Sequence, residues 1–328
     1  MSGIGRSVRN DGIVRQKLTL SFRTVLLAVA FLAGALRPAG AAADQPVVNI
    51  TPRGPRQQSA SVRKTGTIRL DVNAILVPVT VTDASDRPVQ GLRKDAFRLF
   101  EDDVEQQITS SSTEDVPVSV GLIFDASGSM GNKISASATA VDQFFKTTIP
   151  GDEFLLVRFS DKPQFLTGFT PDVGEISKWL HSIRAAGWTA LNDALCLGIQ
   201  KMRGAKNTRK VLLVLSDGGD NNSRYSTREV RELVREAGVG IYSISFFQGS
   251  RLLESISNET GGRMIQVHHV SDLPEAIEKL SRTIRGQYLL SYYSRNPQND
   301  GKYRRVRVEL TQPMLHASWR RGYYAPAD

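Results

Sequence analysis

The sequence predicts an α/β protein built on a doubly wound, mostly parallel sheet with helices on both faces, flanked by a small all-β, sandwich-like region. Between residues 116 and 286, strands that are apolar throughout, such as "VSVGLIFD" and "KVLLVLSD", alternate with amphipathic helical patterns. That alternation is typical of a parallel sheet covered on both faces. Before and after this region, apolar residues recur at every second position, as in half-buried strands. A chain of 328 residues has room for both parts, since a domain takes roughly 150 residues.

The N-terminal residues 1–43 predict a secretory signal peptide. Basic residues up to Arg23 precede the apolar run "TVLLAVAFLAGAL", and small residues follow, with Ala-x-Ala cleavage positions ending at Ala41 and Ala43. The run is shorter than the about 20 residues that span a bilayer. We therefore expect an exported protein, periplasmic or extracellular, with no membrane span after cleavage. An uncleaved signal would instead serve as an N-terminal membrane anchor.

The net charge of +9 does not indicate a nucleic-acid partner. Residues 1–43 hold six basic side chains and one acidic one, a contribution of +5, so the remainder carries 9 − 5 = +4, without the basic patches that bind nucleic acid. The chain has a single cysteine, Cys196, so no internal disulfide can form. It lies in the helical pattern "LNDALCLGIQKM" and is expected to pack as a small apolar residue.

Residues 44–66 are rich in Pro, Gln, Ser and Arg and predict a disordered linker. The N-terminal β region, 67–115, follows. Its first segment, "IRLDVNAILVPVTVTD", alternates apolar residues with a change of phase at Ala74–Ile75, which predicts a bulge or a turn. Pro78 favours an edge position, because proline cannot donate to a ladder. "FRLFEDDVEQQITS" predicts a hairpin turning at Asp102-Asp103.

Residues 116–286 are predicted to form the α/β domain. In chain order, the pattern indicates the strand "VSVGLIFD", a helix over the stripe Ile134–Phe145, strands "EFLLVRFS" and "QFLTGFT", helices around "GEISKWLHSIR" and after Thr189, the strand "KVLLVLSD", the helix "TREVRELVREAG", the strand "GIYSISFF", the helix "RLLESISNETGG", the strand "MIQV" and a last helix Asp272–Arg285. From residue 287 to 328 the period of two returns, in "YLLSYYS" and in Val306, Val308 and Leu310. This C-terminal β region is expected to pack with residues 67–115.

Three loops at strand-to-helix junctions carry oxygen donors. Asp125, Ser127 and Ser129 follow the first strand of the α/β domain, Thr189 precedes a helix, and Asp217 follows "KVLLVLS". In open α/β sheets, ligands lie beyond the carboxyl ends of the strands. Carboxylate and hydroxyl oxygens without Cys or His suit Mg²⁺ or Mn²⁺, with Ca²⁺ as an alternative. Because two carboxylates only neutralise a dication, a third carboxylate from a partner could still bind it.

The pattern Asp125-Ala-Ser127-Gly-Ser129, with Thr189 and Asp217 on later loops, resembles the metal-ion-dependent adhesion site of von Willebrand factor type A (VWA) domains. The resemblance covers about 116–286, and the flanks are similar to those of secreted bacterial proteins with a VWA-related domain. It implies a cation bound by the hydroxyls and by the aspartates, directly or through water, with an Asp or Glu of a protein ligand completing the shell. It also implies that the last helix shifts when ligand binds.

Plainer interpretations stand beside this one. Each loop alone is ordinary capping or turn chemistry. Asp193 and Asp220 either support the metal ligands or cap local structure, and Trp188 either packs or sits on an exposed rim. The histidines have no metal spacing with these loops and are expected to be structural or solvated: His181, His268, His269 and His316.

Enzyme signatures are missing from the sequence. No Gly-x-Ser-x-Gly elbow surrounds Ser127, and neither a Gly-x-Gly-x-x-Gly turn nor a Walker loop occurs. We therefore expect a protein-binding module and not an enzyme. Two alternatives stay open: a structural envelope subunit with an incidental metal site, and a metal-dependent hydrolase.

Overall fold

The computed structural model describes residues 74–113, 116–246 and 249–327. Contacts divide the chain into two units, 1–47 and 48–328, and all of the described residues belong to the second. The predicted signal peptide and linker lie outside the described residues. Strand β1 begins at Ile75, but the residues before Ala74, which the predicted change of phase also involves, lie outside the described residues, so that change stays a prediction. The proposed division of the chain into segments stays a prediction.

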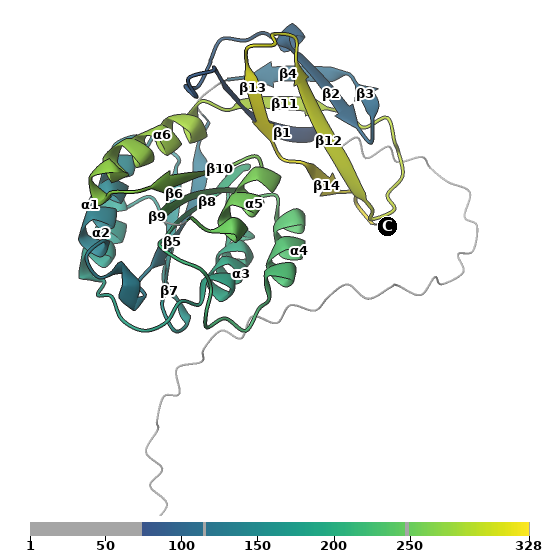
Figure 1. The fold of residues 1–328 in the computed structure, drawn as a ribbon. Helices are drawn as coiled ribbons and strands as arrows, with labels where there is room; N and C mark the ends of the chain where they lie inside the picture. The colour runs from purple at the N-terminus through teal and green to yellow at the C-terminus, as the bar shows by residue number, and fades with distance from the viewer. Residues whose placement is uncertain (1–73, 114–115, 247–248, 328) are drawn as a thin grey trace, which may run out of the picture. The chain divides into compact units, whose positions relative to one another are not determined.

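A six-stranded sheet forms the centre of the α/β region, in the order β10-β9-β8-β5-β6-β7 (Figure 1). Five strands are parallel, and β7 runs antiparallel to β6 at one edge. Strand β5 is buried along its whole length, because helices cover both faces of the sheet. The strands span β5 (Val118–Asp125), β6 (Glu153–Phe159), β7 (Pro163–Thr170), β8 (Arg209–Ser216), β9 (Gly240–Phe246) and β10 (Arg263–Val267).

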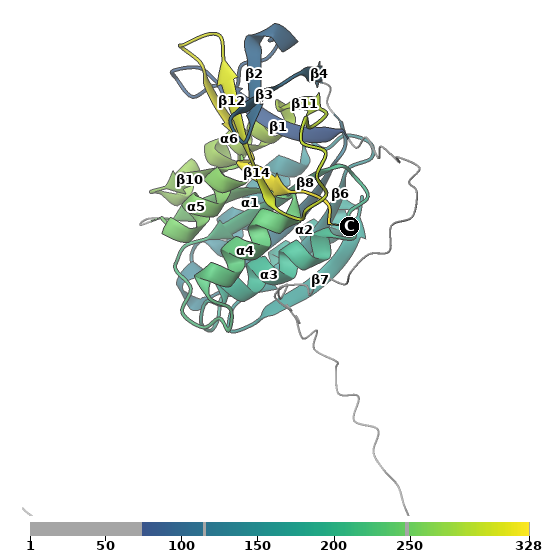
Figure 2. The ribbon, with the colours of Figure 1, turned by 90° about the vertical axis from the view of Figure 1, so that its right-hand side faces the viewer.

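Six α-helices cover the sheet, three on each face. Helices α1, α2 and α6 share one hydrophobic cluster with the sheet, and α3, α4 and α5 share the other; Figure 2 shows the second group in front of the strands. Ser226 opens α4 with a capping box, and Gly238 follows it in the left-handed region at φ 66°, where glycine is favoured. The helices span α1 (Ile134–Phe145), α2 (Val173–Ser182), α3 (Leu191–Met202), α4 (Thr227–Ala237), α5 (Arg251–Glu259) and α6 (Leu273–Arg285), with short 3₁₀ helices η1 (Lys94–Ala96), η2 (Gly128–Met130) and η3 (Val270–Asp272).

Two four-stranded sheets combine N-terminal and C-terminal strands, in the orders β13-β1-β11-β4 and β14-β12-β2-β3. A third hydrophobic cluster, with Val79, Leu99 and Tyr288 at its centre, draws residues from both sheets. The predicted fold class, an α/β domain flanked by a small all-β region, is therefore confirmed. The strands span β1 (Ile75–Thr82), β2 (Phe97–Glu101), β3 (Val104–Gln106), β4 (Ile108–Ser112), β11 (Tyr288–Tyr292), β12 (Tyr303–Leu310), β13 (His316–Trp319) and β14 (Gly322–Tyr324).

Two local expectations in the β region have different outcomes. The hairpin at Asp102-Asp103 is confirmed, with both residues at positive φ, 46° and 67°, between the paired strands β2 and β3. The edge position of Pro78 is wrong, because β1 lies between β11 and β13. Pairing with β13 begins only at Val79, so at Pro78 itself the strand is paired on one side, with β11. A proline is tolerated there for the same reason that it is tolerated at an edge.

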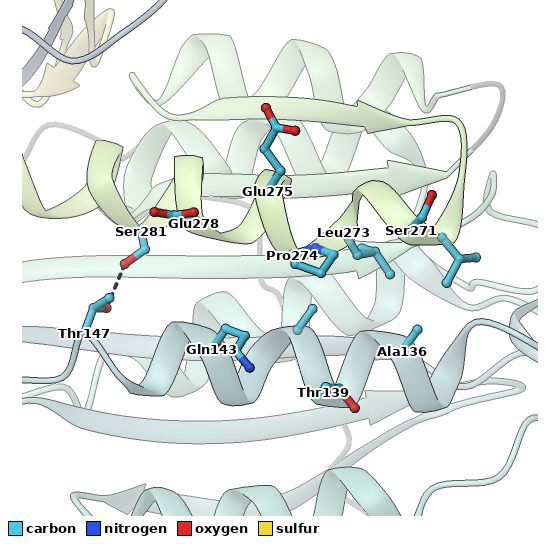
Figure 3. A pocket seen from close by; sticks show the side chains of 12 residues that line it. Ala136, Thr139, Gln143, Thr147, Ser271, Leu273, Pro274, Glu275, Glu278 and Ser281 are labelled. Atoms are coloured by element: carbon cyan, nitrogen blue, oxygen red, sulfur yellow. Dashed lines mark hydrogen bonds between the residues drawn. The ribbon is translucent and has the colours of Figure 1, made fainter.

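A groove runs between α1 and α6 and encloses about 500 Å³ (Figure 3). The Thr147 and Ser281 hydroxyls share a hydrogen bond of 2.7 Å across it, and Leu273 and Pro274 line it from the α6 side. The groove leaves space beside α6, which leads through Gly286 towards β11. Among the described residues, no helix is both long and apolar enough to cross a bilayer.

Candidate metal centre

Asp125 is the last residue of β5 and its side chain is fixed from two directions. It is fully buried. Its Oδ1 accepts a hydrogen bond from the Ser127 backbone N–H at 2.8 Å, and its Oδ2 accepts one from the Ser216 hydroxyl at 2.6 Å. Ser216 ends the neighbouring strand β8, so adjacent parallel strands place the hydroxyl beside the carboxylate. Ser216 was missed at the sequence level, although it directly precedes Asp217.

The Ser127 and Ser129 side chains connect the loop after β5 to the loop after β8. The two hydroxyl oxygens lie 3.1 Å apart, and Ser129 donates to Asp217 Oδ1 at 2.8 Å. The Ser129–Asp217 contact joins residues 88 positions apart in the chain. Ser129 is exposed while Ser127 is buried, so the cluster reaches from the interior to the surface.

Thr189 belongs to the same group of loops through its backbone. Its carbonyl accepts from the backbone N–H groups of Asn221 and Asn222 at 3.0 and 3.2 Å, and its N–H donates to Asn221 Oδ1 at 2.8 Å. Nearby, the Gly128 N–H donates to the Gly187 carbonyl at 3.0 Å. Within the described residues, no hydrogen bond joins the Thr189 side chain to the other four predicted ligands.

The charge distribution around Asp125 fits a cation. Burial raises the pKa of Asp125, and the neighbouring Asp217 carboxylate acts in the same direction, whereas the hydrogen bonds from Ser216 and Ser127 oppose the rise. The nearby ammonium of Lys133 pairs with Asp217, and Asp125 is held by the hydrogen bonds from Ser127 and Ser216. A buried carboxylate beside a second carboxylate is costly unless positive charge is supplied. The donor set therefore suits a hard divalent ion.

Hydroxyl oxygens are essential to any such centre. Among residues 74–113, 116–246 and 249–327, no three or more His, Cys, Asp and Glu side chains gather in a metal-binding group. Asp125 and Asp217 supply only two carboxylates. A cation held here thus depends on serine and threonine donors, which add no charge and leave the ion partly positive.

Lys133 is a second site residue, after Ser216, that the sequence did not indicate. Its Nζ lies 2.5 Å from Asp217 Oδ2 and donates to the Ser129 carbonyl at 2.5 Å. The Lys133 and Asp217 side chains are only 7% and 4% exposed, so this ion pair is buried. The one sequence signal was spacing, since Lys133 follows Ser129 by four residues at the start of α1.

Asp193 and Asp220 fasten the third loop to α3. Asp193 accepts from the backbone N–H groups of Arg224 and Tyr225 at 2.9 and 3.0 Å. Asp220 accepts from the Asn192 N–H at 3.2 Å. Of the two interpretations, these contacts support the capping role.

The remaining candidates have the expected environments. Trp188 is 64% exposed, which fits a rim residue and not a core residue. Its backbone N–H donates to Asp161 Oδ1 at 2.7 Å. Cys196 is buried and free, and burial raises the pKa of its thiol to about 12, which leaves it unreactive. His181 Nε2 lies 2.8 Å from Asp142 on the helix surface, away from the predicted ligands.

Residues 120–219 match the family described as von Willebrand factor type A domain. Among curated proteins, the chain is similar to human inter-alpha-trypsin inhibitor heavy chain H4, with 24% identity over 56% of this chain and 22% of that protein. It is also similar to bovine inter-alpha-trypsin inhibitor heavy chain H3, with 26% identity over 56% and 23%. The match thus spans about a quarter of the length of these relatives.

Solved structures with a similar fold include a von Willebrand factor type A protein from Catenulispora acidiphila, with 13% identity, coverage of 78% of this chain and 74% of that chain, and a TM-score of 0.49. Another is proximal thread matrix protein 1 from the mussel byssus with a zinc-occupied MIDAS (metal-ion-dependent adhesion site) motif. It has 18% identity, covers 56% of this chain and 49% of that chain, and gives a TM-score of 0.46. From the matched residues and the sheet order together, the α/β region of this chain contains a von Willebrand factor type A domain.

Proposed function

We propose that this protein is an exported, divalent-cation-dependent protein-binding module and not an enzyme. The cation, Mg²⁺ or Mn²⁺ with Ca²⁺ as the alternative, is held by Asp125, Ser127, Ser129, Thr189 and Asp217. An Asp or Glu of a protein partner completes its shell. The observation that carries the proposal is the convergence of buried Asp125 and Asp217 with two serine hydroxyls at the carboxyl ends of β5 and β8.

The residues of the chain perform distinct tasks in this proposal. Ser216 and the Ser127 N–H hold the Asp125 carboxylate in one orientation, which lowers the cost of ordering it when a cation binds. When bound, the cation supplies a positive centre that attracts an acidic side chain. Exposed Ser129 lies at the surface where that side chain would arrive, and exposed Trp188 offers an aromatic face to the partner.

Calorimetric titration of the purified chain with Mg²⁺, Mn²⁺ and Ca²⁺ tests the cation site. We expect Asp125→Ala and Asp217→Ala to weaken binding by roughly tenfold or more, since even residues behind the ligands of metal sites cost that much. Asp142→Ala, which removes a partly exposed aspartate on α1 that pairs with His181, serves as the matched control and should bind like the wild type. Equal binding by all four proteins would remove the site.

Capture of partners from envelope extract tests the binding function. We expect one or more proteins to be retained in the presence of the cation, released by chelator, and absent when Asp125→Ala protein is used. A chelator-insensitive set of partners, identical for the wild type and the variant, would favour the structural-subunit alternative. Hydrolysis that depends on both the cation and Asp125 would favour the hydrolase alternative.

A further inference from the structure

Lys133 places a positive charge inside the candidate metal centre. Its ammonium lies 2.5 Å from Asp217 Oδ2 and 2.5 Å from the Ser129 carbonyl. The other Asp217 oxygen accepts from the Ser129 hydroxyl at 2.8 Å. The Asp217 carboxylate is a predicted metal ligand, so the ammonium and a divalent cation would share it, whereas Lys133 contacts Ser129 through the backbone carbonyl and not through the predicted hydroxyl ligand.

The charge count shows that the two cations oppose each other. Asp125 and Asp217 contribute two negative charges, and Lys133 contributes one positive charge. A dication added while Lys133 stays in place would give the buried cluster a net charge of +1. The ammonium and the dication would then both contact the Asp217 carboxylate. Like charges so close together in a poorly solvated site repel strongly. Binding is therefore easier once the ammonium leaves Asp217.

We propose that Lys133 is a built-in competitor of the divalent cation, which sets the cation concentration at which the partner-binding surface forms. The inference rests on the proposed function and adds its regulation. Cation binding breaks the ion pair between Lys133 and Asp217. That ion pair, while it is formed, lowers the affinity of the site for the cation. Because coupling between two binding events is reciprocal, each effect implies the other.

The position of Lys133 allows such an exchange. It occupies the N-cap position of α1 without a side-chain capping hydrogen bond. The helix dipole disfavours a positive charge at this end, so the ion pair with Asp217 does much to keep the ammonium there. The lysine side chain has a flexible four-carbon stem. Its Nζ also lies 5.9 Å from the centre of the Phe246 ring, an aromatic surface that can attract a cation.

A cation titration with a matched pair of lysine variants tests the proposal. Lys133→Met removes the ammonium and keeps the length of the side chain. Lys206→Met is the control, because Lys206 pairs with Glu153 at 3.6 Å, at the opposite end of the central strands. We expect Lys133→Met to bind Mg²⁺ and Mn²⁺ about ten- to hundredfold more tightly than the wild type, and Lys206→Met to bind like the wild type.

The outcomes separate this proposal from the proposed function. If Lys133→Met binds no more tightly than the wild type while Asp125→Ala abolishes binding, the metal centre stands and Lys133 is only a structural ion pair. If neither the wild type nor Lys133→Met binds a cation, both proposals are wrong. Binding by Lys133→Met alone would support both and would show that the competition is complete in the wild type.

A second measurement uses the wild type, so it can be made even if Lys133→Met does not fold. Brief acylation of lysines with an activated acetate ester, followed by mass spectrometry, reports how readily each amine reacts. We expect saturating Mg²⁺ to raise the acylation rate of Lys133 several-fold and to leave that of Lys206 unchanged. An unchanged Lys133 rate, with Mg²⁺ binding verified in the same sample, would overturn the proposal.

Discussion

The buried Asp125 carboxylate is a local cost that the surrounding residues only partly offset. Two hydrogen bonds hold it, yet burial and the nearby Asp217 raise its pKa. A group whose pKa is raised in the folded state stabilises the fold while protonated, and that contribution is lost as pH rises through the folded pKa. In chelator, Asp125 therefore works against stability near neutral pH. With a cation bound, the ionised Asp125 carboxylate would instead stabilise the folded state.

Asp125→Asn isolates this effect. In chelator, we expect the free energy of unfolding of the wild type to fall relative to that of Asp125→Asn as pH rises above the ordinary range of aspartate. The variant carries no charge at this position and so lacks this source of pH dependence. Urea unfolding across a series of pH values measures the difference. Parallel curves for the two proteins would show that Asp125 is not penalised by its burial.

Among the elements, the ends of the central strands show what the sequence could and could not reveal. Runs such as "VSVGLIFD" predict strands because only a sheet covered on both faces buries every residue, and β5 does so. The three donor-bearing loops follow from the same reasoning, since carboxyl ends of parallel strands share one edge. Lys133 could not be predicted, because a lysine beside a helix start is normally solvated and becomes buried only where Asp217 arrives from another loop.

The pairing partner of a strand is equally hard to predict. Pro78 indicated an edge because the sequence does not show that β13, far along the chain, pairs with β1 only from Val79 onward. Local patterns predict the elements, whereas the order of strands in the flanking sheets depends on contacts between distant segments.

A buried ion pair fixes the end of α6 to the start of the central sheet. The Asp152 carboxylate accepts from the backbone N–H of Val118 at 2.8 Å and of Ile149 at 2.9 Å, and it pairs with Arg285. Its side chain is fully buried. We expect Asp152→Ala to lower the free energy of unfolding by about 3–5 kcal/mol, because Arg285 and two buried backbone N–H groups lose the Asp152 carboxylate.

Urea denaturation at neutral pH measures the cost of Asp152→Ala. The matched control is Arg282→Ala, which breaks the exposed pair with Glu278 on the same helix and should cost less than about 1 kcal/mol. A similar, small effect of both substitutions would mean that the buried pair does not hold α6 in place.

Helix α6 is also the element through which ligand binding would reach the β region. It borders the groove shared with α1 (Figure 3) and leads through Gly286 towards β11. We expect amide hydrogen exchange in residues 272–295 to change when cation and partner are both bound, because a shift of α6 into or along the groove would alter its hydrogen bonds. Identical exchange in the bound and unbound protein would exclude this coupling.

Across the second unit of the chain, one carboxylate ties the turn after β1 to the α/β domain. Asp86 pairs with Arg263 of β10 and with Lys279 of α6, the latter at 2.5 Å. Partial burial opposes ionisation of Asp86, but the hydrogen bonds and charges of Arg263 and Lys279 outweigh it and lower the pKa. A lowered pKa gives stability above the unfolded-state value that disappears as pH falls through the folded pKa.

Asp86→Asn tests that link without disturbing the backbone, because asparagine tolerates the positive φ of 62° at this position. We expect the wild type to be more stable than the variant at neutral pH, and the two to converge at acid pH, where Asp86 is protonated. Thermal unfolding followed by circular dichroism measures both. A constant difference at all pH values would point to a steric effect of the substitution.

The central claim for the whole molecule is that one divalent cation lies among Asp125, Ser127, Ser129, Thr189 and Asp217. Anomalous diffraction from a crystal grown with Mn²⁺ tests it most directly. We expect one strong peak enclosed by these five side chains, with Lys133 withdrawn from Asp217. A crystal with Mn²⁺ bound elsewhere, and with Lys133 still paired to Asp217 in the absence of any peak between them and Asp125, would contradict it.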